Sequence, residues 1–79
     1  MATIRFLGRL REAVGTSALT VTLPEGVRDT ESLRHWLGGD HPALREGSIR
    51  IAVNAELQPG SAPLDEGDEI AFLPPMSGG

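Results

Sequence analysis

Cysteine and lysine are both absent from this chain of 79 residues. Without a thiol the chain forms no disulfide, no cysteine-based zinc site and no persulfide on a side chain. All seven basic residues are arginines, so there is no internal ε-amine to form a Schiff base or to accept an isopeptide bond. These two absences exclude thiol chemistry and ε-amine chemistry on the side chains of this protein.

Long apolar runs and an excess of positive charge are missing as well. No stretch of 18 apolar residues occurs, and the N-terminal segment has no extended apolar core. We therefore expect a cytoplasmic protein without a membrane span or a targeting segment. Eleven acidic residues against seven basic ones give a net charge of −4 and a pI near 4.9. This balance opposes binding to nucleic acid or to an anionic membrane surface.

What is present is the composition of a small soluble fold. Apolar residues make up 39% of the chain and charged residues 23%, which is ordinary for a globular domain and too apolar for a disordered tail. A chain of this length forms one small domain with a modest core. We therefore do not expect a self-contained enzyme with a deep active site of its own.

Two periodicities divide the chain into elements. Residues 19–23 alternate between apolar side chains and threonine, which is typical of a half-buried strand. Leu33, Trp36 and Leu37 have the spacing of one buried helix face, so we place Trp36 in the core. Applied along the chain, these patterns predict strands at 3–8, 19–23, 49–53 and 69–73, a short helical turn at 9–14, a main helix that begins at Asp29 or Thr30 and ends at Gly38-Gly39, a turn region at 40–48 with room for a further helical turn, and a short edge strand near Leu57.

The order of these elements predicts the fold class. A strand hairpin, a crossover helix and returning strands make a mixed sheet with the helix packed on one face. This is the β-grasp arrangement that ubiquitin has. We predict an α+β, ubiquitin-like β-grasp domain over residues 1–73, followed by a flexible, extended tail over residues 74–79 that ends in Gly-Gly.

Few residues have the spacing that catalysis or metal binding requires. His35 and His41 are the only histidines, and neither has a second histidine or a spaced set of carboxylates nearby. We interpret both as solvated helix or loop residues and predict no metal site. The acidic residues at 65, 66, 68 and 69 lack the spacing of a calcium-binding loop, so we interpret them as a polar hairpin turn.

The C-terminal residues are the most informative part of the chain. Consecutive prolines at 74 and 75 end the last strand and favour an extended backbone, so the six residues from 74 reach roughly 18–20 Å from the domain. Gly78 and Gly79 have no side chain, and they fit a channel too narrow for other residues. Chance places glycine at both positions about 2% of the time, and a frayed terminus of small residues is the alternative. The residues expected to thread a channel are Pro74, Pro75, Met76, Ser77 and Gly78, with Gly79 as the reacting terminus.

A second feature points to a partner. Alternate apolar residues of each predicted strand are expected to face the helix. The opposite face of the sheet then carries further apolar residues where polar ones are expected. In a β-grasp sheet the first and last strands are parallel neighbours, so Leu7 and Leu73 lie together where the tail begins. Such a patch is typical of a docking surface, and incidental exposure of single leucines is the alternative. The apolar residues are Leu7, Ala52, Ala71 and Leu73. Arg5, Arg11 and Arg50 either form a polar rim around them or are simply solvated.

The sequence resembles the family of small, sulfur-carrying subunits of molybdopterin synthase, which are ubiquitin-like proteins. The resemblance covers essentially the whole chain and is carried by Phe-Leu-Gly-Arg-Leu-Arg-Glu at 6–12, residues 30–37 of the main helix, Ala-Val-Asn at 52–54, Leu-Asp-Glu-Gly-Asp-Glu-Ile-Ala-Phe at 64–72, and Pro-Pro-Met-Ser-Gly-Gly at 74–79. The chain departs from the family pattern at Met76, where valine is usual, and at Leu7 and Leu73, where aromatic residues are frequent.

The resemblance implies a carrier chemistry on Gly79. In that family the terminal carboxylate is adenylated by an activating enzyme that uses ATP, and a sulfur donor protein then provides the sulfur of a thiocarboxylate. The resemblance further implies that the tail enters the large synthase subunit, in a heterotetramer, and donates sulfur to cyclic pyranopterin monophosphate to form the molybdopterin dithiolene. Catalytic residues then belong to the large subunit, and the carrier itself binds no cofactor. By position, Leu57 and Leu73 correspond to apolar partner contacts.

Two alternatives stay open. The same tail chemistry serves sulfur carriers of thiamine or cysteine biosynthesis, and a ubiquitin-like protein modifier would be conjugated through Gly79 to lysines of target proteins. The diproline and Phe72 favour the molybdopterin interpretation over both.

Overall fold

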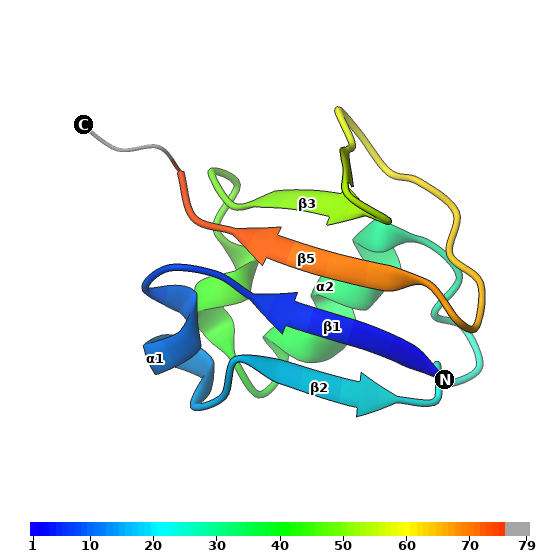
Figure 1. Cartoon of the computed structure of the whole chain (residues 1–79), viewed down its shortest axis with the longest axis horizontal. Coiled ribbons are helices and arrows are strands. Elements are labelled where there is room, and N and C mark those ends of the chain that lie inside the picture. Colours follow the sequence, from blue (N-terminus) through cyan, green and yellow to red (C-terminus); the bar gives the residue numbers. More distant parts are fainter. Residues whose placement is uncertain (76–79) are drawn as a thin grey trace.

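The structure, a computed structural model, describes residues 1–75. Within this range, one mixed sheet of five strands carries the main helix on one of its faces (Figure 1). The elements in chain order are β1 (Ala2–Phe6), α1 (Leu10–Val14), β2 (Ala18–Val21), α2 (Thr30–Gly38), the 3₁₀ helix η1 (Pro42–Arg45), β3 (Arg50–Val53), β4 (Glu56–Leu57) and β5 (Glu69–Leu73). Every predicted element is present, and its ends shift by at most a residue or two.

The order of the strands confirms the predicted fold class. The sheet runs β2-β1-β5-β3-β4. β1 pairs antiparallel with β2 and parallel with β5, and β5 pairs antiparallel with β3. Parallel neighbours cannot be joined by a tight turn, and the long connection between β1 and β5 contains α2. This is the α+β, ubiquitin-like β-grasp fold, with β5 ending at Leu73.

The main helix begins at a capping box. The Asp29 carboxylate accepts a hydrogen bond from the backbone N–H of Ser32 (2.8 Å), and the Ser32 hydroxyl oxygen accepts one from the backbone N–H of Asp29 (3.2 Å). These bonds satisfy N–H groups that have no partner inside the helix. The bond from the Ser32 N–H, followed by that from its hydroxyl, lowers the pKa of the Asp29 carboxyl below its ordinary value of 3.8. Asp29, and not Thr30, is therefore the cap.

The prediction that Trp36 lies in the core is wrong, because this residue is 41% exposed. The buried stripe of α2 consists of Thr30, Leu33 and Leu37. With 3.6 residues per turn, Trp36 lies roughly 90° from the centre of that stripe. Leu33 and Leu37 can form a stripe with Trp36 or a stripe with Thr30. The stripe that covers the sheet is the one with Thr30.

Alternate residues of β1 and β5 build the core between the sheet and α2. The Phe6 and Phe72 side chains are fully buried, and their rings stack with centroids 5.8 Å apart. Ile4 and Ile70, which are paired in register, are equally buried. The core-facing register predicted from the alternation is therefore confirmed. The buried apolar cluster comprises Ala2, Ile4, Phe6, Leu10, Val27, Leu33, Leu37, Leu44, Ile49, Ile51, Leu64, Ile70 and Phe72.

The β3–β4 hairpin is tied to the beginning of β5. Asn54 and Ala55 form its turn with φ angles of 49° and 72°, which is the left-handed region that two-residue hairpin turns use. The Asn54 side-chain amide donates to the Asp68 carboxylate (3.0 Å), and its carbonyl oxygen accepts from the backbone N–H of Glu69 (2.9 Å). These bonds hold in place the edge of the sheet that carries Leu57.

Candidate functional site

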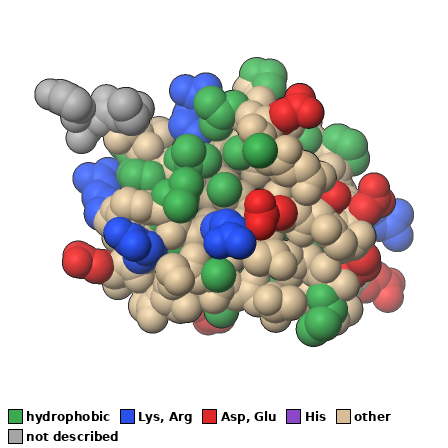
Figure 2. Space-filling model, in the orientation of Figure 1, with side chains coloured by type: hydrophobic (Ala, Val, Ile, Leu, Met, Phe, Trp, Pro, Cys, Tyr) green, Lys and Arg blue, Asp and Glu red, His purple; other side chains and the backbone are tan. Residues whose placement is uncertain are grey.

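The face of the sheet opposite α2 carries a group of apolar side chains that the described residues leave open to solvent. Leu7 is 41% exposed and Leu57 is 52% exposed, while Ala71 and Leu73 are half-buried. Figure 2 shows hydrophobic side chains gathered on this face, at the end of the sheet where the chain leaves β5. We call this group the open-face patch; it consists of Leu7, Ala52, Leu57, Ala71 and Leu73.

The sheet register brings the residues of the open-face patch together. Ala52 of β3 lies opposite Ala71 of β5 on one side and opposite Leu57 of β4 on the other. Cross-strand neighbours on one face have Cβ atoms about 4.5–5.5 Å apart, so these three side chains form a continuous apolar row. Although Ala52 belongs to the open face, it is only 7% exposed, because its small side chain is flanked by these neighbours.

Leu7 and Leu73 are neighbours at the point where the chain leaves the sheet. The backbone N–H of Leu7 donates to the carbonyl oxygen of Phe72 (3.1 Å), which continues the parallel pairing of β1 and β5 by one residue. Gly8 follows with φ of 56°, and a Cβ atom placed on it would lie 2.9 Å from Cγ of Pro74. The turn after β1 therefore passes directly beside Pro74, and a glycine permits this close approach.

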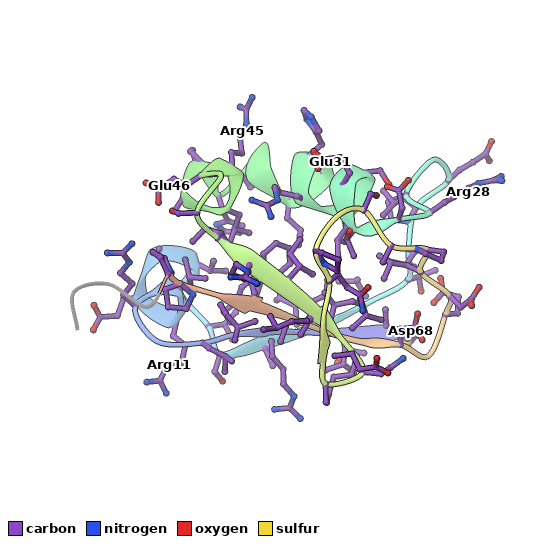
Figure 3. All side chains as sticks on the ribbon, turned by 90° about the horizontal axis from the view of Figure 1, so that it is seen from above. Arg11, Arg28, Glu31, Arg45, Glu46 and Asp68 are labelled. Carbon is purple, nitrogen blue, oxygen red and sulfur yellow. The ribbon has the colours of Figure 1, made fainter. Side chains whose placement is uncertain are left out.

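Arginine side chains border the open-face patch. Arg5 pairs with Glu69, with 2.8 Å between Nε and Oε2. Arg50 lies opposite Leu73 in the register of β3 and β5, and Arg11 extends from α1 away from the layer that contains α2 (Figure 3). All three are exposed. The structure thus places the three arginines that the sequence predicted as a polar rim on the side of the patch.

Other predicted site residues have different outcomes. Pro74 and Pro75 are half-buried at the end of β5, whereas the predictions for Met76, Ser77, Gly78 and Gly79 lie outside the described residues. His35 is exposed and His41 is half-buried. In residues 1–75, no three histidine, cysteine, aspartate or glutamate side chains come together where they would hold a metal ion. In the same range, no helix has the length and apolar character needed to cross a membrane.

The sequence analysis missed the role of Arg34 in α2. Its guanidinium donates to the backbone carbonyl oxygens of Glu46 (2.8 Å) and Ile49 (2.8 Å), with a longer contact to that of Leu44 (3.5 Å). It thereby fixes the segment between η1 and β3, directly before Arg50. No sequence pattern indicates this role, because the hydrogen-bond partners of Arg34 are backbone carbonyl oxygens of residues 10–15 positions away.

The described residues form a ubiquitin-like β-grasp domain with the open-face patch beside the end of β5. The ThiS family model matches residues 4–79. The chain belongs to the ThiS family.

Three known proteins show how far the similarity extends. The molybdopterin synthase sulfur carrier subunit of Escherichia coli strain K12 is 36% identical over 83 aligned positions, which cover 100% of both chains. The solution structure of the small archaeal modifier protein 1 of Methanosarcina acetivorans is 28% identical with a TM-score of 0.78, covering 99% of this chain and 95% of that one. A chain in the complex of subunits 1 and 2 of the molybdopterin-converting factor of Helicobacter pylori is 28% identical with a TM-score of 0.68, covering 99% and 97%.

Proposed function

We propose that this protein is the sulfur carrier subunit of a molybdopterin synthase, with the terminal carboxylate of Gly79 as the group that carries sulfur. The observation that carries the proposal is the open-face patch at the end of β5, in a chain that aligns over its whole length with sulfur carrier subunits. An apolar face beside the end of β5 and a sequence that ends in Gly-Gly fit a protein that is held by its globule while its end reacts elsewhere.

The chemistry on Gly79 requires two steps. A carboxylate resists attack by sulfur because it is anionic and its oxygen is a poor leaving group. In the first step the carboxylate attacks the α-phosphorus of ATP on an activating enzyme, and pyrophosphate leaves. In the second step a sulfur nucleophile attacks the acyl carbon, AMP leaves, and a thiocarboxylate remains. A chain without cysteine has no thiol to hold the sulfur, so its terminus serves as the carrier.

The partner that consumes the thiocarboxylate is the large synthase subunit, in a heterotetramer. The sulfur attacks cyclic pyranopterin monophosphate, and water then cleaves the acyl–sulfur bond and restores the carboxylate. Two such deliveries form the dithiolene. The large subunit provides the catalytic residues, and a sulfur donor protein provides the sulfur to the activating enzyme. Contacts of Leu7, Leu57 and Leu73 with the large subunit bury the open-face patch, which is the kind of apolar surface that partners cover.

Reconstitution tests this proposal. The chain is incubated with the activating enzyme, ATP and a sulfide source, and mass spectrometry is expected to show replacement of one oxygen by sulfur. Addition of the large subunit and cyclic pyranopterin monophosphate is then expected to give molybdopterin. Deletion of Gly79, or addition of one residue after it, is expected to abolish sulfur transfer, because the reacting atom is no longer at the required distance from the docked globule.

Two controls separate loss of chemistry from loss of fold. Both length variants are expected to keep the thermal unfolding midpoint of the wild-type chain, because the buried cluster lies within residues 2–72. Met76→Val keeps the length of the chain and is expected to keep sulfur transfer. A variant with one added residue that still forms molybdopterin contradicts the proposal.

A second candidate function is protein modification through Gly79, which the similarity to the small archaeal modifier protein 1 favours. The two functions differ in their products. A modifier accumulates as isopeptide conjugates on lysines of other proteins, whereas a sulfur carrier is released unconjugated after each transfer. Mass spectrometry of tryptic peptides from cells that express the tagged chain distinguishes them by the presence or absence of a remnant of residues 51–79 on lysine, because Arg50 is the last residue of this chain after which trypsin cleaves.

A further inference from the structure

Charge is distributed unevenly along the strands, although the chain as a whole is acidic. Thr3 pairs with Glu69 and Ala2 pairs with Val21, so the start of β5 and the end of β2 lie at the same end of the sheet. The neighbouring turns carry acidic residues, and Figure 2 shows most of the visible acidic side chains at this end. These residues are Glu25, Asp65, Glu66 and Asp68.

The opposite end of the open face, where the chain leaves β5, carries arginines. Arg50 is in register with Leu73, and Arg11 lies on the open side of the sheet (Figure 3). Carboxylates lie near these arginines without forming ion pairs with them: Glu12 lines one hollow with Arg11, and Glu31 lines another with Arg50. Within residues 1–75, the ion pairs are those of Arg5 and of the N-terminal amine, so Arg11 and Arg50 make none.

Docking of a partner changes the solvation of these two arginine side chains and therefore their contribution to the free energy. An unpaired guanidinium that is exposed and solvated does not destabilise the free protein. A partner that covers the open-face patch removes water from the border of the patch, where these arginines lie. A charge buried without a counter-charge destabilises a complex by several kcal/mol, whereas a paired one is close to neutral or favourable. A partner that fits this surface therefore brings carboxylates to the positions of Arg11 and Arg50.

We propose that the partner's docking surface is an apolar contact bordered by carboxylates, and that Arg11 and Arg50 direct this acidic chain onto it with the end of β5 facing the entrance for the C-terminal segment. The inference rests on the proposed function, because it concerns the protein that receives Gly79. With a net charge of −4 on the whole chain, the arginine end is the part of the surface that an acidic border attracts. The separation of charge thus orients the encounter as well as stabilising the complex.

A nucleic acid is the other partner that exposed arginines attract. It fits this surface less well, because the arginines surround leucines rather than forming a continuous stripe. Glu69 also neutralises Arg5 on the same face. Phosphate backbones need a run of cations, and among the described residues this end of the sheet offers three arginines outside ion pairs, namely Arg9, Arg11 and Arg50.

The test compares two variants with the same net charge. Arg11→Gln with Arg50→Gln removes two positive charges from the border of the open-face patch. Arg28→Gln with Arg45→Gln removes two from the side of the helix layer, where both arginines are located in Figure 3. Association rate constants with the large synthase subunit are measured by stopped flow at about 0.01 M and about 0.5 M salt, where the screening lengths are near 30 Å and 4 Å.

The expected result is a difference that depends on position and not on net charge. At low salt the Arg11/Arg50 variant associates about threefold to tenfold more slowly than the Arg28/Arg45 variant, and the difference disappears at high salt. Arg11→Lys with Arg50→Lys keeps both charges and is expected to keep the low-salt rate. Thermal unfolding of each variant checks that the fold is unchanged.

Three outcomes overturn the inference. Equal rates for the two glutamine variants at low salt show that the position of the arginines does not matter. If the wild-type chain does not bind the large subunit, the large subunit is not the partner of this surface. Binding of single-stranded RNA or of anionic vesicles that is lost in the Arg11/Arg50 variant assigns the arginines to another ligand. A position-dependent rate in a complex that transfers no sulfur leaves the inference standing and rejects the proposed function instead.

Discussion

The two faces of the sheet are built from the same strands and have opposite character. Phe72 and Leu73 are consecutive residues of β5, yet Phe72 is fully buried against α2 and Leu73 belongs to the open-face patch. The helix face is closed by thirteen buried apolar residues, whereas the open face presents exposed leucines among arginines. Because successive side chains of a strand point to opposite faces, one strand contributes to the core on one side and to an open apolar surface on the other.

This comparison means that stability and binding are separable by single substitutions at neighbouring positions. A small domain has only a few kcal/mol of net stability, about 3–5 at this size. A change on the helix face therefore acts first on folding. A change at a leucine of the open face is expected to act first on partner binding, because these leucines are exposed or half-buried in the free protein.

The largest effect is expected from Phe72→Ala. Truncation of a fully buried phenylalanine costs about 3–5 kcal/mol, and it also removes the stacked contact with Phe6. This loss equals the stability of the whole domain, so the variant is expected to be largely unfolded at 25 °C. Circular dichroism and urea titration measure it. A cooperative unfolding transition near that of the wild type contradicts the assignment of Phe72 to the core.

Leu73→Asp is the matched change one residue further on. We expect it to reduce stability by about 1 kcal/mol and to weaken binding to the large subunit at least about 30-fold, since a charge then faces an apolar contact. Calorimetric titration measures the affinity. His35→Asp, which adds the same charge on an exposed position of α2, on the other side of the sheet, serves as the control and is expected to bind normally. A Leu73→Asp variant that loses its fold but binds with normal affinity in the folded fraction shows that Leu73 faces the core.

Acid is expected to have a smaller effect on the free energy of unfolding. The group concerned, Asp68, lies at the edge of the sheet that carries Leu57. Hydrogen bonds from the backbone N–H of Asp65, and then from the Asn54 amide, lower the pKa of the Asp68 carboxyl below its ordinary value of 3.8. The ionised carboxylate thus stabilises the folded state above the unfolded pKa. This contribution is lost as the pH falls from about 5 through the lowered pKa of the folded state.

Urea unfolding between pH 6 and pH 3 measures this contribution. Asp29 and Glu66 have carboxyl pKa values lowered in the same direction, so the wild-type chain loses stability with acid at several sites. Asp68→Asn is expected to lose less stability than the wild type over this range, because position 68 no longer titrates. An unchanged dependence on pH shows that Asp68 does not contribute.

Most of the fold was predictable because its signals are local. Alternation identified the strands, a capping residue at Asp29 or Thr30 marked where the main helix begins, and the turn residues at 65–68 marked where the last strand begins. Trp36 was misplaced because the spacing of apolar residues in one helix does not say which of two overlapping stripes meets the sheet. The role of Arg34 was unpredictable because its hydrogen bonds go to backbone carbonyls whose positions depend on the folded chain.

The site was predictable to the extent that it follows from alternation and topology. The parallel pairing of β1 with β5 places Leu7 beside Leu73, as the β-grasp arrangement requires. The burial of Ala52 was not predictable from its phase, because it depends on the neighbours that Ala71 and Leu57 provide across the sheet. The close approach of Gly8 to Pro74 likewise depends on the three-dimensional path of the turn.

The position of β5 has a mechanical consequence. It is the middle strand of the sheet, hydrogen-bonded to β1 on one side and to β3 on the other. A force applied at residue 74 along the strand acts on both rows of bonds at once and slides them against each other, instead of opening them one after another. If an enzyme draws the end of this chain inward, the force acts on a strand that is hydrogen-bonded on both sides, which favours a globule that stays folded.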